Sequence, residues 1–428
     1  MNTKSLTAGS ARPGAAFAPP PLARPRHPRQ VAMERAAGRA ALGAQHAFAA
    51  LGLFLFTGAV LPLLLHESGV ALDPAEGNPL LRNVYGAFYA GALVLAAVHA
   101  RAAAAAVRRS PATLALVVLA VASTAWSAAP DLSLRRGLAL LGTTAFGVFL
   151  AARYDNRALL RLLAVVFGAA AVLSLLFAVG LPRYGIDEAP HAGAWRGIYA
   201  QKNGLGQTMV MGTVVLLLAS RQLRAGRRAA WAAAALSAAL LVLSTSKTAL
   251  TVLATLLLLT ALYRVLRWRT TLAVPTLIAM VLAGGVAALW VVGNTELLLA
   301  SLGKDPSLTG RAPMWNAALG TLAGEPWLGF GYSAFWQGLE GPSRDVVLAL
   351  EWEAPHAHNG FLDLGLQLGA AGVALFLAAL LPALVRAVRV LRRTRGTDGL
   401  WPLVFLSFLV LYNVTETTLL QQNSLYWV

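Results

Sequence analysis

Of the 428 residues in this chain, 57% are hydrophobic and only 12% are charged, whereas an ordinary soluble domain carries about 25% charged residues. The formal net charge of +17 suggests nucleic acid at first sight, but most arginines stand in short clusters between apolar runs, as topology signals do, so we expect no nucleic-acid partner. The chain has no cysteine, which excludes disulfides, thiolate catalysis and cysteine-held metals.

The first stretch, residues 1–42, is rich in Pro, Ala and Arg and shows no apolar face. This composition predicts a disordered basic cytoplasmic tail. The apolar run Ala47–Leu65 that follows is longer than the roughly 7–15-residue core of a cleavable signal. We therefore expect residues 43–428 to form one polytopic membrane domain.

The later apolar runs are long enough to cross roughly 30 Å of hydrocarbon, and backbone groups in lipid must be paired within the segment. They do not alternate polar and apolar residues as membrane-barrel strands do. The prediction is an all-α polytopic integral membrane protein with about 11–12 transmembrane helices and one large outward loop. The expected helices cover residues 47–65, 84–100, 112–127, 136–153, 158–181, 204–220, 229–243, 248–264, 271–293, 359–385 and 400–415. The apolar ending Leu419–Val428 predicts a partial twelfth helix or an interfacial segment.

The basic residues orient these helices. With the tail inside, the inner connections hold 18 of the 35 lysines and arginines and the tail holds seven, which leaves ten for the outer side. Positive charge collects on the cytoplasmic side of membrane proteins. The long polar stretch Asn294–Leu362, with its loop 294–358, is therefore expected to face outward.

The outward basic residues are informative because topology does not require them. Single cations near a membrane boundary often extend to the water and do nothing more. As a set on one side, however, they favour a seat for a phosphate-bearing ligand, because guanidinium groups match phosphate oxygens bidentately. The set is Arg82, Arg135, Arg136, Arg183, Arg196, Lys202, Lys247, Lys304, Arg311 and Arg344.

Arg196 and Lys202 flank the expected start of a helix at Asn203. The free N–H groups and positive dipole end of such a start favour an anion. The alternative is a loop that is merely capped by Asn and Gly. Lys247 lies in the turn STSKTAL, and Arg136 stands where the fourth expected helix opens.

In the outer loop, residues Pro313–Ala323 are expected to form a helix, since Pro suits a first helical turn. Trp315, Leu319 and Leu322 are spaced along one face, which predicts an amphipathic helix lying in the membrane interface. Arg311, just before this helix, would then meet a pyrophosphate at bilayer height. The alternative is an ordinary buried arginine paired with one of the acidic residues of the loop.

Two histidines precede the tenth expected helix. A helix N-terminus disfavours imidazolium, so His358 should stay neutral and able to accept a proton near pH 7. A sugar hydroxyl attacking an anomeric carbon needs such a base. His356 could instead join His358 in a metal site, helped by Glu351 and Glu353, but closeness in sequence does not establish ligand geometry.

Several segments together resemble the O-antigen ligase/polymerase (Wzy-type) superfamily of bacterial envelope proteins, and most of all its exopolysaccharide-polymerase (ExoQ-like) branch. They are Trp126–Ser127 with Pro130, WRGIYAQKNGLG, STSKTAL, SLTGRAPMW, PWLGFGYSAFW, APHAHNGFLDLGLQLG and Asn413–Glu416. The resemblance covers roughly residues 115–425.

The resemblance implies a GT-C-like, all-helical membrane glycosyltransferase that works without metal or cofactor. Its substrates would be undecaprenyl-pyrophosphate-linked saccharides at the periplasmic face of the bacterial cytoplasmic membrane. By resemblance, Arg196 and Arg311 would hold the donor pyrophosphate and His358, of the HN element, would deprotonate the acceptor. We add Lys202 and Lys247 to the donor site, with Asn203, His356, Asn359 and Arg136 as secondary residues. Flippase and chain-length regulator proteins are the expected protein partners.

Two other functions stay open at this point. A ligase of the same superfamily would move a finished chain onto lipid A-core, and the GFGYSAFW and PHAHNGFLDL segments lean toward a polymerase instead. A transporter of lipid-linked saccharide would place charges near the bilayer midplane on broken helices. Here the charges gather at outer helix ends, with Asp363 as the main exception.

Overall fold

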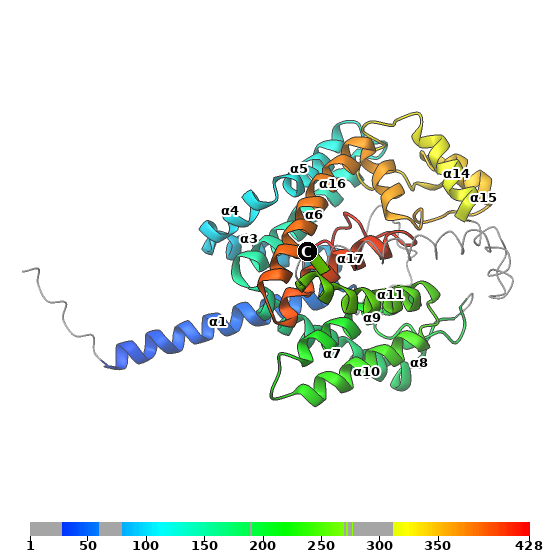
Figure 1. The fold of residues 1–428 in the computed structure, drawn as a ribbon. Coiled ribbons are helices and arrows are strands. Elements are labelled where there is room, and N and C mark those ends of the chain that lie inside the picture. The colour runs from blue at the N-terminus through cyan, green and yellow to red at the C-terminus, as the bar shows by residue number, and fades with distance from the viewer. Residues whose placement is uncertain (1–27, 60–78, 189–190, 269–270, 273–275, 277–310) are drawn as a thin grey trace, which may run out of the picture. The chain divides into compact units, whose positions relative to one another are not determined.

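The computed structural model describes residues 28–59, 79–188, 191–268, 271–272, 276 and 311–428 (Figure 1). By its contacts the chain divides into two units, Met1–Phe48 and Ala49–Val428. The α-helices of the described residues are α1 (Pro28–Phe56), α3 (Pro79–Val98), α4 (Ala100–Arg109), α5 (Pro111–Ala122), α6 (Pro130–Arg153), α7 (Asn156–Gly180), α8 (Pro182–Gly185), α9 (Lys202–Ser220), α10 (Arg227–Leu243), α11 (Lys247–Leu262), α14 (Arg311–Leu322), α15 (Arg344–Leu350), α16 (Gly360–Arg393) and α17 (Trp401–Tyr412). Short 3₁₀ turns are η1 (Ser123–Ala125), η2 (Tyr263–Arg267), η3 (Gly338–Glu340) and η4 (Thr397–Gly399).

The prediction of an all-α polytopic membrane protein is confirmed. Seven helices of the described region are long and apolar enough to cross a membrane, and an eighth span results if α4 and α5, bent by 89°, are counted as one. Three expected spans correspond to the shorter helices α5, α10 and α17, of 12, 17 and 12 residues. The expected helix 271–293 lies largely outside the described residues. These differences account for the gap between seven or eight spans and the expected 11–12.

Helix α1 corrects the expected tail. It begins at Pro28, so residues 28–42, which we expected to be disordered, are helical. The alanine-rich sequence of this stretch has high intrinsic helix propensity, which does not require an apolar face. The rest of the expected tail lies outside the described residues.

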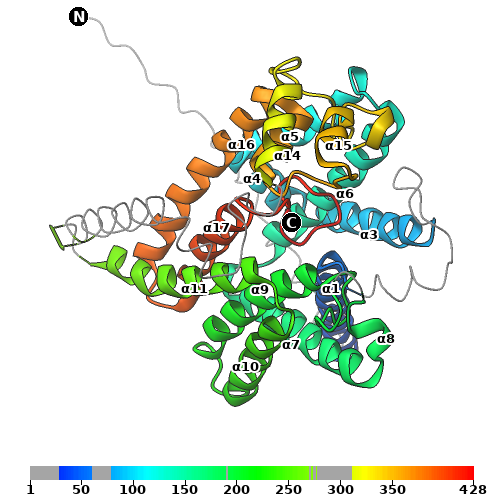
Figure 2. The same cartoon turned by 90° about the vertical axis from the view of Figure 1, so that its right-hand side faces the viewer.

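Helix α9 is the buried centre of one group of helices. It packs against α7, α10 and α11, which lie beside it in both views (Figures 1 and 2). Glycines on α9 allow this close approach, as small residues do between membrane helices. A Cβ added to Gly206 would lie 3.0 Å from the Cβ of Ala249 on α11, and one added to Gly212 would lie 3.2 Å from Oγ of Ser237 on α10.

Helix α16 is broken at Gly369, where φ is 60° and ψ is −161°. The break frees backbone groups, and the segment Pro326–Gly331 pairs with them. Phe330 N donates to Leu366 O at 2.9 Å, and Ala370 N donates to Pro326 O at 2.8 Å. Irregular backbone at membrane depth is tolerated where its polar groups are paired within the protein.

The same segment also meets the start of α6. Trp126 Nε1 donates to Leu328 O at 3.2 Å, and Ser133 Oγ donates to Tyr332 O at 2.7 Å. Three stretches that are far apart in sequence, around residues 126–133, 326–332 and 366–371, therefore form one hydrogen-bonded unit. This unit fixes the N-terminal half of α16, next to the two histidines.

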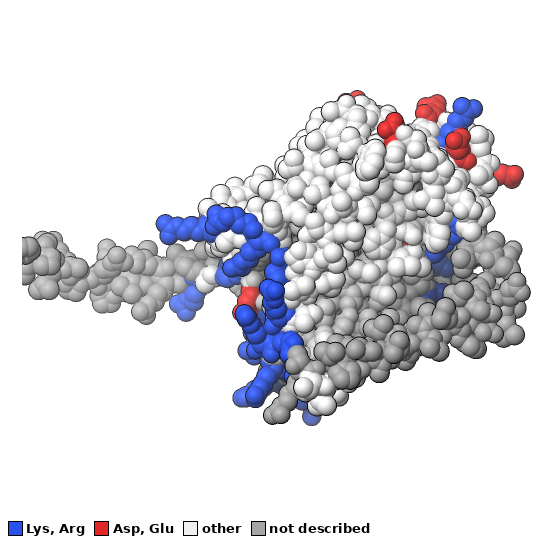
Figure 3. Space-filling model, turned by 45° about the horizontal axis from the view of Figure 1, so that its top comes forward, with Lys and Arg blue, Asp and Glu red and all other residues white. Residues whose placement is uncertain are grey.

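Charge is distributed unevenly over the described surface. Figure 3 shows a dense group of Lys and Arg side chains on one side, while Asp and Glu side chains gather in another region. Arg221, Arg224 and Arg264, from connections that we expected on the cytoplasmic side, line one cavity. The orientation expected from the sequence stays a prediction.

Candidate functional site

The turn His358–Gly360 is held in one conformation by its neighbours. Asn359 caps α16, and its Oδ1 accepts hydrogen bonds from the backbone N–H groups of Phe361 and Leu362, both at 3.1 Å. Gly360 N donates to Asn413 O at 2.9 Å and to Glu416 O at 3.0 Å. A Cβ at Gly360 would collide with the side chain of Asn413, so only glycine permits this docking.

His358 itself has a φ of 48°. A left-handed conformation is uncommon for a residue with a side chain, and such strain persists only where the surroundings impose it. The conformation places His358 Nδ1 3.3 Å from Oε2 of Glu416. Oε1 of the same carboxylate lies 3.8 Å from a terminal nitrogen of Arg311. The His358 side chain remains 23% exposed, so a substrate can reach it.

His356 packs beside His358, and both side chains are half-buried. The two rings lie 4.1 Å apart between centroids, and His358 N donates to Nδ1 of His356 at 3.2 Å. Burial lowers the pKa of His356 from 6.5 to about 4, and the charge of His358 acts in the same direction. His356 is therefore neutral near pH 7, as an imidazole that accepts a hydrogen bond must be.

A buried carboxylate, Asp363, anchors the loop that carries the histidines. It accepts hydrogen bonds from Trp336 Nε1 at 2.7 Å, from Ala357 N at 3.1 Å and from the hydroxyl of Thr417. Trp315 Nε1 donates to Ala357 O at 2.8 Å, so α14 is tied to the same loop. Asp363 thus links the histidine loop to the segment that contains Glu416.

Helix α14 has the expected position, and Arg311 is its first residue. The helix packs against protein through Met314 and Ala318, which lie in a cluster that also holds Phe335 and Leu366. Leu319 is 53% exposed, and the expected contact of its face with the membrane interface stays a prediction.

His356, His358 and Glu416 could hold a metal ion by distance, because one ligand atom of each lies within 4.8 Å of the others. Two imidazoles and one carboxylate are a familiar donor set. The Arg311 guanidinium already faces the carboxylate, however, and a divalent cation would be repelled by it. The glutamates that we considered from sequence, Glu351 and Glu353, do not belong to this group.

The expected donor residues around the start of α9 form a second group. Arg196 donates from Nε to Tyr184 O at 3.0 Å and from Nη2 to Arg183 O at 3.0 Å, and its Nε lies 3.6 Å from Oδ1 of Asp187. Lys202 N donates to the other oxygen of Asp187, also at 3.0 Å. Within the described residues, these bonds use Arg196 to shape its own loop, and none joins it to Arg311 or His358.

Asn203 connects this group to the histidine site. Ser246 Oγ, beside Lys247, donates to Asn203 Oδ1 at 3.0 Å. The hydroxyl of Tyr412 donates to Asn203 O at 3.4 Å, and Glu416 N in turn donates to Tyr412 O at 2.9 Å. The starts of α9 and α11 are thereby joined to the segment that presents Glu416.

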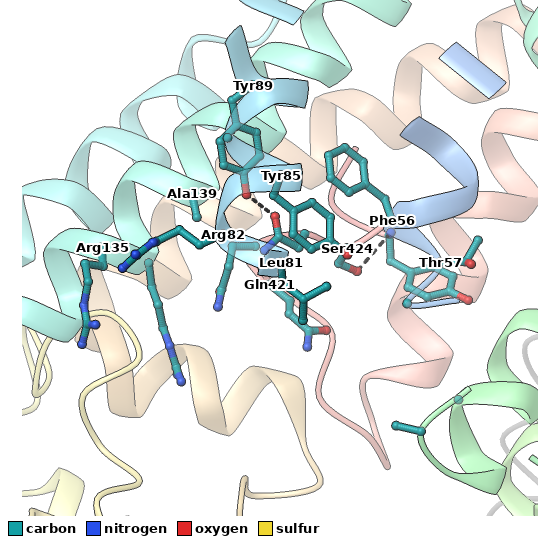
Figure 4. A pocket seen from close by; sticks show the side chains of 18 of the residues that line it. Phe56, Thr57, Leu81, Arg82, Tyr85, Tyr89, Arg135, Ala139, Gln421 and Ser424 are labelled. Atoms are coloured by element: carbon teal, nitrogen blue, oxygen red, sulfur yellow. Dashed lines mark hydrogen bonds between the residues drawn. The ribbon is translucent and has the colours of Figure 1, made fainter. Parts of the chain in front are cut away.

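Arg136 lies in a different place, a cavity of about 820 Å³. Arg82 and Arg135 share it with Tyr85 and Tyr89 of α3, and Figure 4 shows these side chains around the cavity. The opposite wall comes from the loop before α9 and from the C-terminal segment. The remaining polar lining side chains are Thr57, Tyr199, Gln201, Gln207, Gln421, Gln422, Asn423, Ser424 and Tyr426. Nε2 of Gln207 is buried without a hydrogen-bond partner among the described residues.

The C-terminal segment joins this cavity to the histidine site. Residues 413–428 contain no helix, so the expected partial twelfth helix was wrong. The segment packs inward through Leu419 and Leu420, and Tyr332 donates to Leu420 O at 2.6 Å and to Gln422 Oε1 at 2.8 Å. Five residues span at most about 18 Å, so Gln421, which lines the cavity, lies within that distance of Glu416.

Sequence reasoning missed Glu416 and the structural use of Asp363. The signal was present, because Asn413–Gln422 is polar at many positions where a membrane helix would be apolar. An acid in such a segment indicates a functional partner. Nothing in the local sequence, however, shows that it meets a histidine 58 residues earlier in the chain.

The chain is similar to proteins of known families. Residues 232–377 match the family model described as O-antigen ligase. The chain is 32% identical over 285 residues to the exopolysaccharide production protein ExoQ of Rhizobium meliloti (strain 1021), an alignment that covers 63% of each chain. It therefore spans less than two thirds of the length of that relative. Residues 232–377 are thus similar to the O-antigen ligase family, and the 32% identity supports a likeness to its ExoQ-like branch.

Proposed function

We propose that this protein polymerises undecaprenyl-pyrophosphate-linked repeat units into an exopolysaccharide or O-antigen-type polysaccharide. The reaction would be a metal-independent, inverting glycosyl transfer at the outer face of the bacterial cytoplasmic membrane. The observation that carries the proposal is the contact of Glu416 with both His358 and Arg311. Through Glu416, the proposed base His358 and the cation Arg311 lie together at the start of α16.

In this mechanism His358 is the general base. The tautomer that carries its proton on Nδ1 donates to Glu416 and leaves the lone pair of Nε2 for the acceptor. The acceptor hydroxyl transfers its proton to Nε2 as its oxygen attacks the anomeric carbon. The bond from that carbon to the pyrophosphate oxygen breaks, and the lipid pyrophosphate leaves with the electron pair. Glu416 then stabilises the imidazolium.

Arg311 is suited to the leaving group. A guanidinium that is already fixed in position stabilises charge as it develops on the pyrophosphate, without reorganisation at the moment of reaction. Its contact with Glu416 and its place at the first residue of α14 restrict its position. Lys202 and Lys247 would supply further positive charge from the starts of α9 and α11.

The cavity that contains Arg136 is suited to the saccharide part of a substrate. Its tyrosines offer flat apolar faces, and its amide side chains can donate to and accept from sugar hydroxyls. It is within about 18 Å of Glu416 along the C-terminal segment, a distance that a short oligosaccharide can cover. We infer that growing chain or donor sugar lies here during transfer.

The test is reconstitution in vesicles with a purified lipid-linked repeat unit. We expect a ladder of longer lipid-linked glycans, and we expect His358→Ala to abolish it, while His46→Ala, an exposed histidine of α1, leaves it intact. Transfer to added lipid A-core in place of a ladder would identify a ligase. Movement of intact lipid-linked saccharide across the vesicle membrane, without new glycosidic bonds, would identify a transporter.

The stereochemical outcome is a separate test. Attack from the face opposite the leaving group inverts the anomeric configuration, so the new linkage should have the configuration opposite to that of the donor. NMR of the product gives this directly. A retained configuration would exclude the single-displacement mechanism, whatever the identity of the sugars.

A further inference from the structure

A second cavity lies at the other ends of the helices, among the connections that we expected on the cytoplasmic side. It has a volume of about 930 Å³. Residues from the start of α7, the α9–α10 connection, η2 and the α16–α17 connection line it. Seven of the lining residues are arginines: Arg157, Arg221, Arg224, Arg227, Arg264, Arg267 and Arg395. Asp398 is the one acid among the described residues that line it.

The positive-inside rule accounts for arginines on this side but does not account for their convergence. Topology requires charge near helix ends, with no requirement that the charges surround one space. Arg389, Arg392 and Arg393, at the end of α16, satisfy the rule on the same side and do not line the cavity. Four separate chain segments bring the seven arginines together.

The walls of this cavity are hydrogen-bonded to one another. Arg267 donates from Nη2 to Gly396 O at 2.7 Å and from Nη1 to Arg395 O at 3.1 Å, which fixes η2 against the α16–α17 connection. Thr397 Oγ1 donates to Leu218 O at 2.8 Å and so ties that connection to α9. The concave shape therefore does not depend on a ligand.

A rigid concavity with this excess of like charge favours an anion of several charges. A single phosphate would compensate little of the positive charge, and it would fill a small part of about 930 Å³. The lining residues stand at the ends of helices that are long and apolar enough to cross a membrane, and such ends meet lipid headgroups. Basic pockets between such helices on the cytoplasmic side suit headgroups with more than one phosphate.

We propose that this cavity binds the headgroup of an anionic phospholipid that carries two phosphate groups. Arg221, Arg224 and Arg264 are exposed and can pair bidentately with phosphate oxygens. The acyl chains would then lie against the apolar flanks of the neighbouring helices. The site is distinct from the outward site of glycosyl transfer and does not depend on its chemistry.

The experiment measures lipid binding by the full-length, delipidated protein with native mass spectrometry. The probes are tetraoleoyl cardiolipin, dioleoyl phosphatidylglycerol at twice the concentration to match charge, and dioleoyl phosphatidylcholine. The test variant is the triple substitution Arg221→Gln, Arg224→Gln, Arg264→Gln. The matched control, Arg389→Gln, Arg392→Gln, Arg393→Gln, removes the same charge from the same side. Thermal unfolding in lipid-free detergent checks that both variants fold.

We expect cardiolipin to bind the wild type and the control variant more tightly than either other lipid. The test variant should bind it about 100-fold more weakly, at roughly fivefold for each arginine near anionic lipid. The proposal would be overturned if both triple variants bound cardiolipin equally weakly, or if the wild type bound phosphatidylglycerol as tightly as cardiolipin. Either result would mean that lipid binding reflects general surface charge.

Inorganic pyrophosphate separates a lipid from a soluble anion. If it binds in lipid-free detergent, displaces cardiolipin and loses affinity in the test variant alone, the cavity takes a soluble diphosphate and the lipid assignment is wrong. A test variant that unfolds in lipid-free detergent is replaced by the single substitution Arg224→Gln, for which about fivefold weaker binding is expected.

Discussion

His358 Nδ1 lies 3.3 Å from Glu416 Oε2, and the first residue of α14, Arg311, meets the other oxygen of that carboxylate at 3.8 Å. One carboxylate thus contacts both the imidazole and the guanidinium. Substituting Glu416 by Gln should therefore lower kcat by about 100-fold, within the roughly 10²–10⁴-fold that general-base catalysis contributes. The KM for donor should change little, because the amide oxygen still faces Arg311. Steady-state kinetics in vesicles measure both.

The conservative variant and a matched control make this prediction specific. Glu416→Asp should recover part of kcat, since it keeps the charge, and Glu325→Gln, an exposed acid at the end of α14, should behave as wild type. If Glu416→Gln raises KM and leaves kcat unchanged, Glu416 does not act through His358.

Arg311 is expected to act on the donor. Arg311→Gln should lower kcat/KM by about 10²–10³-fold, as loss of one group that stabilises a developing oxyanion does. The fold should persist, because Met314 and Ala318 anchor α14. Arg344→Gln, an exposed arginine of α15, is the control. Unchanged kinetics of Arg311→Gln at limiting donor would remove Arg311 from the mechanism.

His356 makes stability depend on pH in acid. Its folded-state pKa of about 4 lies below the unfolded value of 6.5, so between these values the unfolded chain binds more protons than the folded protein. The contribution of neutral His356 to stability is thus complete above pH 6.5 and is lost as pH falls toward 4. Thermal unfolding in detergent should show a shallower fall in Tm over this range for His356→Gln than for the wild type. Parallel curves would contradict the neutral state of His356 in the folded protein.

Metal chelation tests the alternative use of the histidine cluster. Because the Arg311 charge faces Glu416, we expect dialysis against EDTA to leave polymerisation unchanged. Added Zn²⁺ should inhibit at high concentration by competing for His358, and His356→Gln should reduce that inhibition. Loss of activity with EDTA and its recovery with one metal would show that the cluster holds a catalytic ion.

The break in α16 should be intolerant of any side chain. At Gly369, with φ of 60° and ψ of −161°, a Cβ would collide with the backbone of Trp327. Gly369→Ala should therefore cost at least about 1–3 kcal/mol from backbone strain alone. Gly320→Ala in α14, where a Cβ meets nothing within 4 Å, should be neutral or stabilising. Denaturant unfolding and yield of folded protein compare the two.

The class of fold could be predicted from composition because lipid permits few ways to pair a backbone. Helix ends were harder. The predicted span 359–385 extends to Arg393 in the structure, and its break at Gly369 could not be foreseen because it depends on pairing with Pro326–Gly331. Helix propensity is a property of one segment, whereas this break depends on hydrogen bonds between two segments of the chain.

The candidate site, too, contains residues that could be predicted from local sequence and contacts that could not. His358, Asn359 and Arg311 stand in local motifs, and the structure brings them to one place through Glu416 and the α16 cap. Arg136 belongs to the separate cavity, and Arg196 bonds to its own loop. Basic residues in loops expected on the same side of the membrane cannot be told apart from the sequence. Long-range packing decides which of their side chains come into contact.

The docking of Gly360 onto Asn413 and Glu416 has a consequence for biogenesis. Translation proceeds from the N-terminus, so α14, the histidine loop and α16 are synthesised before the segment that completes them. Until Glu416 emerges, His358 has no carboxylate and Arg311 has no partner in this site. The nascent protein can thus insert most of its helices before the contacts among His358, Glu416 and Arg311 can form.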